Sequence, residues 1–152
     1  MRRRELLLTP LALGLVGAQV RAGAPQWNGG HPVSDDPLWE PLSAAAVTVD
    51  RASGALHAGF RPEIILMAEQ IVTVEGFILP LDILRSTNHF ALTRRNAGCP
   101  FCAPNQPTEA VEVVSVSPVT VGPELTRMRG RLHLHSSSDQ GMFYQLTEAR
   151  RA

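Results

Sequence analysis

The sequence predicts one mainly β domain, built as a small OB-like barrel of five strands that follows an irregular N-terminal arm. Three observations lead to this fold class. Five short segments between residues 70 and 149 alternate β-branched or aromatic residues with polar ones. Turn-forming residues separate these segments, and no apolar pattern of helical period follows residue 70. Many short strands with regular turn signals favour a barrel or a sandwich.

The first part of the mature chain is expected to be an extended arm. Residues 23–37 are rich in glycine, proline and aspartate, which excludes a helix interior or a central strand. Trp39, with its leucine neighbours at 38 and 42, offers the first apolar anchor. Residues 44–62 fit either a loose hairpin or part of a helix. Residues 63–70 are too short for a choice between helix and strand.

The barrel strands are predicted in the second half of the chain, within a single domain of residues 38–152. The opening V-T-V-E-G-F and the later M-R-G-R-L-H-L are typical of a five-stranded Greek-key barrel of the OB type. A glycine in the first strand marks a place where it bends. The predicted strands are residues 70–81, 89–95, 108–116 with an extension at 119–121, 127–135 and 141–149.

The N-terminus predicts export. A basic start, an apolar run and V-R-A indicate a signal peptide over residues 1–22 that is cut after Ala22. The segment Arg3 to Leu7 resembles the twin-arginine signal, and the ordinary secretory route stays open. We therefore expect a periplasmic or secreted protein. No later segment is long enough to span a membrane, and the ten arginines and thirteen acids that remain argue against nucleic-acid binding.

The two cysteines, Cys99 and Cys102 in C-P-F-C, suit several kinds of site. A thioredoxin fold needs a helix after this motif, and Pro104 and Pro107 exclude it. Thiol–disulfide redox chemistry on another fold remains open. So do a metal site, a small disulfide that stiffens the turn, and two idle buried thiols.

The metal hypothesis adds His133 and His135 to the cysteines. In R-L-H-L-H the two histidines are two residues apart, so on a strand they point to one face. With Cys99 and Cys102 they would form a Cys2His2 site that suits Zn²⁺ or Cu⁺. The alternative is a solvated outer face, with the two leucines of this segment turned inward.

Other polar residues have simpler expected roles. Asn105 and Gln106 are expected to satisfy the backbone of the cysteine turn, whereas Trp39 and Phe77 are expected in the core. The sequence has no G-x-S-x-G elbow, no H-E-x-x-H and no phosphate-binding glycine loop. The arginines that either bind an anion or form a solvated face are Arg94, Arg95, Arg127, Arg129 and Arg131.

Several of these segments together resemble an exported bacterial family known only as a domain of unknown function (DUF family 3299). The matching features are a strand with G-F-x-x-P-L, a strand with F-x-L, a proline-rich cysteine turn ending in N-Q, a G-x-L strand and an aromatic strand near the C-terminus. They cover most of residues 38–147. Many members have a histidine where this chain has Phe101, and this chain has a second thiol beside it. The resemblance implies export and an association with transport or metal-handling systems, and it supplies no activity.

Together these observations predict binding in place of catalysis. The expected protein is a small exported binding protein that holds zinc or copper through the cysteine turn and meets an exported or membrane transport component. Two alternatives stay open. One is a thiol–disulfide redox protein that uses the same cysteines, and the other is a structural adaptor whose turn is clamped by a disulfide.

Overall fold

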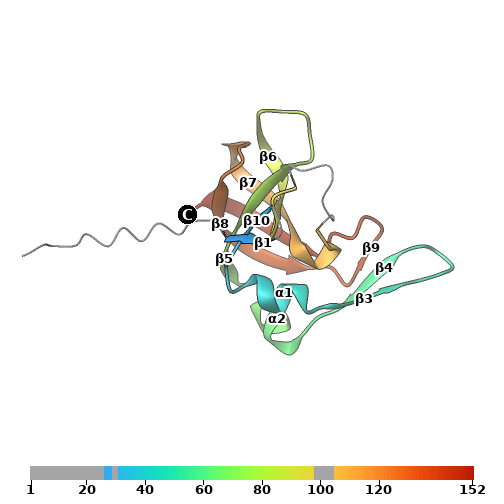
Figure 1. The fold of residues 1–152 in the computed structure, drawn as a ribbon. Coiled ribbons are helices and arrows are strands. Elements are labelled where there is room, and N and C mark those ends of the chain that lie inside the picture. The colour runs from blue at the N-terminus through green and yellow to red at the C-terminus, as the bar shows by residue number, and fades with distance from the viewer. Residues whose placement is uncertain (1–25, 29–30, 98–104) are drawn as a thin grey trace, which may run out of the picture.

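The structure is a computed structural model that describes residues 26–28, 31–97 and 105–152. Its centre is a closed barrel of five strands in the order β10-β7-β6-β5-β8 (Figure 1). The predicted mainly β fold with a five-stranded barrel is therefore confirmed. The barrel strands are β5 (Ile71–Pro80), β6 (Ser86–Thr93), β7 (Ala110–Thr120), β8 (Leu125–Leu134) and β10 (Tyr144–Arg151).

The pairing of these strands is that of an OB-type barrel. The first strand, β5, pairs antiparallel with both β6 and β8. Strand β7 pairs antiparallel with β6, and β10 pairs antiparallel with β8. Strand β10 closes the barrel by running parallel to β7, so the third and fifth barrel strands are neighbours. All five strands lie where the alternating pattern predicts them.

The remaining elements surround this barrel. In the N-terminal arm, β1 (Gln26–Asn28) and β2 (His31–Val33) form a short hairpin. Two short helices, α1 (Trp39–Ser43) and α2 (Pro62–Met67), lie together below the barrel in Figure 1. A second sheet has the order β3-β4-β9, from β3 (Ala46–Val49), β4 (Leu56–Gly59) and β9 (Ser137–Ser138). The 3₁₀ turn η1 (Pro107–Glu109) leads into β7. Of the two alternatives left open for residues 44–62, residues 46–59 form the hairpin. The following segment, residues 62–67, forms a helix.

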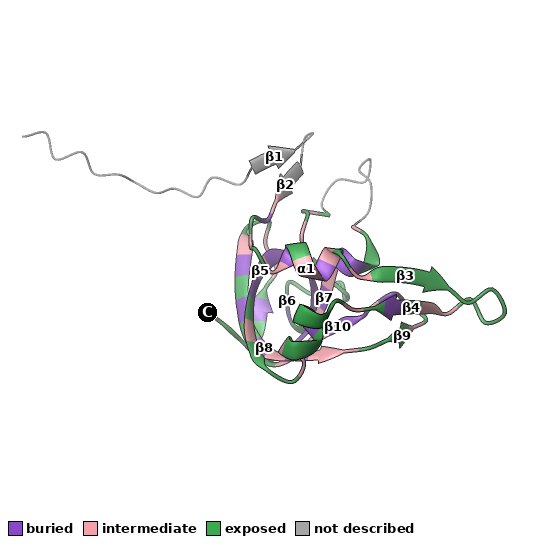
Figure 2. Ribbon diagram, turned by 90° about the horizontal axis from the view of Figure 1, so that it is seen from below, coloured by how far each residue is buried: buried purple, intermediate pink, exposed green. Residues whose placement is uncertain are grey.

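The core residues come mainly from the barrel strands and from α1, α2 and β4, and Figure 2 colours the buried positions along the ribbon. Alternation along β7 and β8 contributes to this core, because alternate residues are buried from Val111 to Ser115 and from Thr126 to Leu132. Trp39 and Phe77 lie in the core as predicted. The Trp39 indole N–H donates to the Glu75 carbonyl at 2.7 Å, and the Tyr144 hydroxyl donates to the Leu42 carbonyl at 2.8 Å. These two bonds fix α1 against the barrel.

Two strand glycines allow close approach of neighbouring chain segments. A Cβ on Gly76 would lie 2.8 Å from the Thr93 carbonyl oxygen, and one on Gly130 would lie 2.6 Å from the Thr147 carbonyl oxygen. Backbone atoms occupy both positions, so only glycine fits without a shift of the strands. Among the described residues, no helix is long and apolar enough to cross a membrane.

Candidate functional site

The cysteine turn connects β6 to β7, and Cys99 and Cys102 lie outside the described residues. The two ends of this connection are held together. The Arg95 backbone N–H donates to Asn105 Oδ1 at 2.9 Å, and Asn105 Nδ2 donates to the Arg95 carbonyl at 3.1 Å. The Gln106 and Glu109 side chains and backbones form a capping box around η1. The predicted backbone-satisfying role of Asn105 and Gln106 is confirmed.

The end of the N-terminal arm lies beside the same turn. Val33 forms an isolated antiparallel bridge with Arg95, and the Ser34 backbone N–H donates to the Arg94 carbonyl at 2.8 Å. Ser34 Oγ also donates to the Glu75 carbonyl at 2.6 Å. The arm therefore ends as a short extra strand against β6, next to the base of the cysteine turn.

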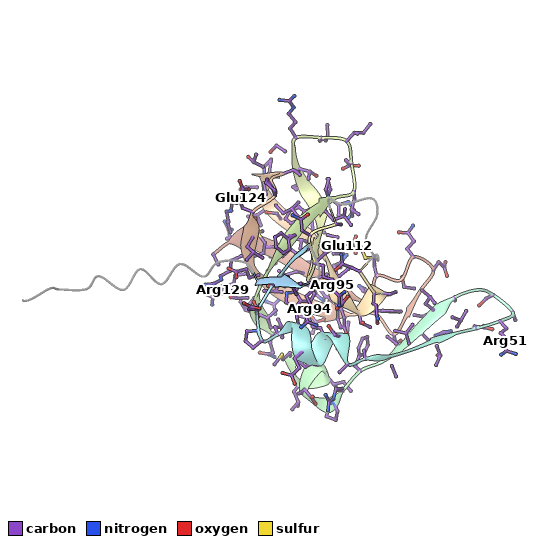
Figure 3. All side chains as sticks on the ribbon, in the orientation of Figure 1. Arg51, Arg94, Arg95, Glu112, Glu124 and Arg129 are labelled. Carbon is purple, nitrogen blue, oxygen red and sulfur yellow. The ribbon has the colours of Figure 1, made fainter. Side chains whose placement is uncertain are left out.

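Most of the predicted arginine set is engaged in contacts within the chain. Arg94 and Arg95 both reach Oε1 of the buried Glu109, at 3.6 and 3.3 Å, and Figure 3 shows them close together. Arg127 pairs with Glu75 at 3.1 Å. Two carboxylates face these three guanidinium groups, since Arg94 and Arg95 share Glu109, so most of the positive charge there is already balanced within the chain.

The two histidines of the metal hypothesis differ in surroundings. His133 points out of β8 and bonds on both sides, with Nδ1 2.7 Å from Glu69 Oε1 and Nε2 2.7 Å from Thr147 Oγ1. His135 is exposed just after β8. Leu132 is buried on the inner side, as the alternative of a solvated outer face predicts, and Leu134 is half-buried.

The Glu69–His133–Thr147 arrangement has the order of a hydrolase triad: carboxylate, imidazole, hydroxyl. Acyl transfer also needs donors for the oxyanion and a cleft that seats the substrate. None of these three residues lines either cavity described below. Glu69 has a φ of 62°, and its backbone N–H donates to the Leu132 carbonyl at 2.7 Å. We assign the cluster a structural role, in which it ties the turn after α2 to β8 and β10.

The described residues contain no group of three or more Cys, His, Asp or Glu side chains placed to share a metal. His133 would have to give up one of its two side-chain bonds to coordinate a metal ion. The four-ligand site also needs Cys99 and Cys102, so the Cys2His2 hypothesis stays a prediction.

One exposed surface was missed by the sequence analysis. Leu81, Ile83 and Leu84 are exposed in the connection from β5 to β6, and Leu79 at the end of β5 is exposed beside them. We call residues 79–85 the apolar loop. It projects from the barrel on the side opposite the two helices (Figure 1). The signal was present in L-P-L-D-I-L-R, because three large apolar residues stand where a turn is normally polar.

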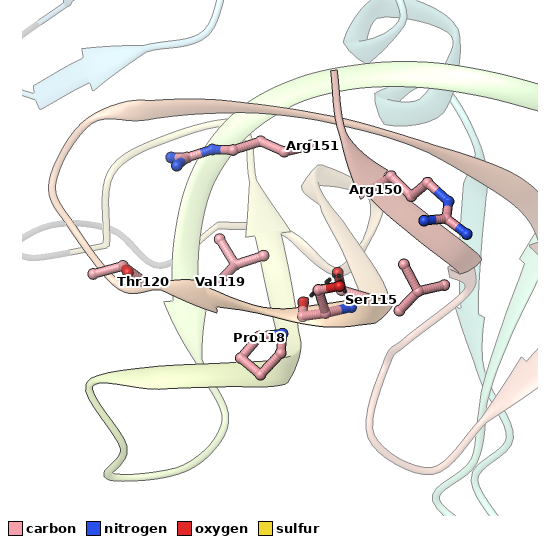
Figure 4. A pocket seen from close by; sticks show the side chains of 8 residues that line it. Ser115, Pro118, Val119, Thr120, Arg150 and Arg151 are labelled. Carbon is pink, nitrogen blue, oxygen red and sulfur yellow. Dashed lines mark hydrogen bonds between the residues drawn. The ribbon is translucent and has the colours of Figure 1, made fainter.

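A cavity of about 320 Å³ lies close to this loop, between the second half of β7 and the end of β10. We call it the arginine groove. Figure 4 shows Arg150 and Arg151 extending on opposite sides of Ser115. Ser115 Oγ is held by the Ser117 and Ala149 carbonyls, at 2.7 and 3.1 Å. The groove is lined by Ser115, Val116, Ser117, Pro118, Val119, Thr120, Arg150 and Arg151.

The arginines around this groove lack acidic partners. Arg129 on β8 stands directly opposite Arg150 on β10, and like charges in such a pair are unfavourable. Within the described part of the chain, neither side chain forms an ion pair or a hydrogen bond, and Arg151 only reaches Thr126 Oγ1 at 3.5 Å. A ligand or partner that carries carboxylates would relieve this repulsion.

A second cavity, of about 350 Å³, lies between the arm and the start of β5. Asp36 lines it and accepts bonds from the backbone N–H groups of Glu75 and Leu38, at 2.7 and 2.9 Å. The Glu75 carboxylate pairs with Arg127. The polar groups of this cavity thus hold the arm in place, and the cavity is not a second candidate site.

The fold and the exposed surfaces define a small OB-like β-barrel with an apolar loop and an adjoining arginine groove. In comparisons with known proteins, the chain matches no family model, no curated protein and no solved structure. The resemblance to DUF family 3299 therefore stays a prediction from sequence.

Proposed function

We propose that the protein is a small exported binding protein that docks a partner through the apolar loop. The single observation that carries this proposal is the exposure of Ile83 and Leu84, at 106 and 59 %. In a single copy of the protein these two side chains stay exposed to water, so folding gains no hydrophobic stabilisation from them. Contiguous exposed apolar side chains mark interaction sites, because their burial in an interface removes apolar area from water.

The arginine groove adjoins the apolar loop, and its positive charge indicates that the partner carries negative charge beside its apolar patch. Ser86 and Thr87, directly after the apolar loop, pair with Thr120 and Val119, which line the groove. A partner seated on the loop therefore also meets the arginines at the end of β10. Its matching chemistry is an apolar patch bordered by carboxylates, as on another exported protein or the exported face of a membrane transport component.

Other ligand classes fit this surface less well. Proteins that bind single-stranded nucleic acid on OB barrels stack bases on aromatic side chains. Among the residues whose burial the structure describes, the large exposed hydrophobic side chains are all aliphatic. The metal hypothesis concerns the separate cysteine turn. The two hydrogen bonds between Arg95 and Asn105 hold the two ends of that turn together. A turn held in this way suits a metal site and a disulfide equally.

The test is site-specific photo-crosslinking in cells that produce and export the protein. A photoreactive residue replaces Ile83 in one variant and Leu66 on α2 in the other. Leu66 is 80 % exposed and lies on the helical side of the molecule, so it is the matched control. We expect an adduct from position 83 that is absent from position 66.

Two further variants separate docking from general stickiness. The first double variant, Ile83→Asp with Leu84→Asp, changes the apolar loop. The matched control, Ile65→Asp with Leu66→Asp, makes the same two substitutions on α2. Only the first pair is expected to abolish an adduct formed from a photoreactive residue placed at Val116, in the groove. Equal adducts from positions 83 and 66, or equal loss with both double variants, would contradict the proposal.

A further inference from the structure

Strand β3 is an unprotected sheet edge. It is the outermost strand of the order β3-β4-β9, and all four of its residues, Ala46 to Val49, are exposed. The hairpin of β3 and β4 extends away from the barrel, and β3 runs along its outer margin (Figures 1 and 2). One side of β3 bonds β4, and its other side presents free N–H and C=O groups to solvent.

Natural proteins usually blunt such an edge with charges, proline or a bulge. Residues 44–49, A-A-A-V-T-V, contain none of these, and the β3–β4 register runs without a shift. Val47 and Val49 are 38 and 60 % exposed on one face of the hairpin. Within this small sheet β3 pairs with β4 alone, so an edge with these residues is suited to pairing with another strand.

We infer that the partner of β3 is the β3 strand of a second copy of this chain, in an antiparallel pair around a two-fold axis at Thr48. In this register Val47 of each copy lies opposite Val49 of the other copy, and the two Thr48 residues lie opposite each other. Pairs of β-branched residues and Thr–Thr pairs are among the favourable cross-strand pairs. The two sheets then join into one continuous sheet of six strands, with the four valines on a single face.

The charges at the ends of β3 agree with this register. Asp50 stands opposite Ala46 of the second copy, and Arg51 stands opposite Ala45, so no two like charges face each other. Asp50 is also held within its own turn, because it accepts bonds from the Ala52 N–H and the Ser53 hydroxyl, each at 2.8 Å. These bonds lower the pKa of Asp50 and keep it charged and turned into its own chain.

The interface is small, so the pairing is weak. Strand pairing of this length buries less than the roughly 1,200 Å² of a standard stable interface. We expect a dimer that forms reversibly at micromolar or higher concentrations. Because a two-fold pair of β3 strands uses the free edge of β3 in both copies, this pairing closes at two copies and does not grow into a filament.

The sharpest test is a disulfide across the two-fold axis. Directly opposed residues of an antiparallel pair have Cα atoms about 4.5 or 5.5 Å apart, and both separations fit a disulfide. Thr48→Cys, in a chain with Cys99→Ser and Cys102→Ser, is therefore expected to form a covalent dimer with oxidised glutathione. Ser53→Cys at the exposed hairpin tip is the matched control. Dimer yields no higher for Thr48→Cys than for Ser53→Cys would overturn the inference.

Sedimentation equilibrium gives a second, independent measurement. Val47→Lys with Val49→Lys places like charges opposite each other and should raise the dissociation constant about tenfold or more. Ile65→Lys with Leu66→Lys removes comparable exposed side chains from α2 and should leave the constant unchanged. A wild-type chain that stays monomeric at millimolar concentration, or equal effects of both double variants, would also overturn the inference. The apolar loop takes no part in this pairing, so the proposed docking function can stand or fall separately.

Discussion

Gly130→Ala is the perturbation whose cost follows most directly from the barrel geometry. Gly130 lies in the middle of β8, and an added Cβ would meet the Thr147 carbonyl oxygen at 2.6 Å, Leu146 Cγ at 2.9 Å and Ala149 Cα at 3.0 Å. Two of these three atoms belong to the backbone of β10, at its bulge. The strand cannot move away without loss of ladder bonds in a closed barrel.

The expected magnitude sets two effects against each other. Overpacking of this kind costs about 1–3 kcal/mol. Alanine in place of glycine in a strand gains about 0.5–1 kcal/mol from lower chain entropy. At mid-range values, about 2 kcal/mol less about 0.75 kcal/mol, the net loss is about 1.3 kcal/mol, which should lower Tm by roughly 5 °C for a domain of this size.

The assay is thermal unfolding followed by circular dichroism, with Gly59→Ala as the control. Gly59 is also a strand residue, but a Cβ there would meet nothing closer than the Ala46 carbonyl oxygen at 3.8 Å. The control should be neutral or slightly stabilising. An unchanged Tm for Gly130→Ala, or an equal decrease for both variants, would refute the reasoning.

Two other predictions concern Tyr144 and the cysteines. Burial raises the pKa of Tyr144, the only tyrosine, above its usual value of about 10, so its stabilising contribution is complete below pH 10 and is lost as the pH rises beyond it. The tyrosinate absorbance should therefore appear together with unfolding, and titration of the folded protein near pH 10 would contradict this. Residues 23–152 purified anaerobically should carry two free thiols and about one equivalent of zinc or copper, which Cys99→Ser with Cys102→Ser removes. An absence of metal, with thiols that appear only after reduction, would contradict the metal hypothesis.

The barrel could be predicted because its strands carry a strong local signal. In β7 the β-branched residues and the period of two predict a strand with Val111 and Val113 inward. Ser115 continues this buried face while Val114 and Val116 are exposed, so beyond residue 113 the strand is predicted better than its faces. Residues 44–70 carry no such signal. Their structure depends on distant contacts, such as the Leu132 carbonyl that accepts the Glu69 N–H bond.

The candidate site could be predicted only in part, for a different reason. Gln106 acts on the backbone of Glu109, three residues on, and Asn105 acts on the backbone of Arg95 at the other end of the same turn, so both roles follow from the chemistry of one turn. The arginine groove joins Ser115 to Arg150 across a parallel strand pair, and only the closure of the barrel brings them together. Of the apolar loop, residues 79–81 are predicted as the end of a strand, because leucine suits a strand as well as a loop, and residues 82–85 carry no prediction.

The two proposed surfaces are compatible with each other in space. The apolar loop projects from one side of the barrel, whereas β3 forms the outer edge of the β3–β4 hairpin, which extends from the side where the helices lie (Figure 1). Pairing of two β3 strands would therefore leave both apolar loops free. A dimer with two free loops binds a surface that carries two partner sites more tightly than either loop alone, since the second contact forms within one complex. Weak β3 pairing and docking through the loops would then reinforce each other on such a surface.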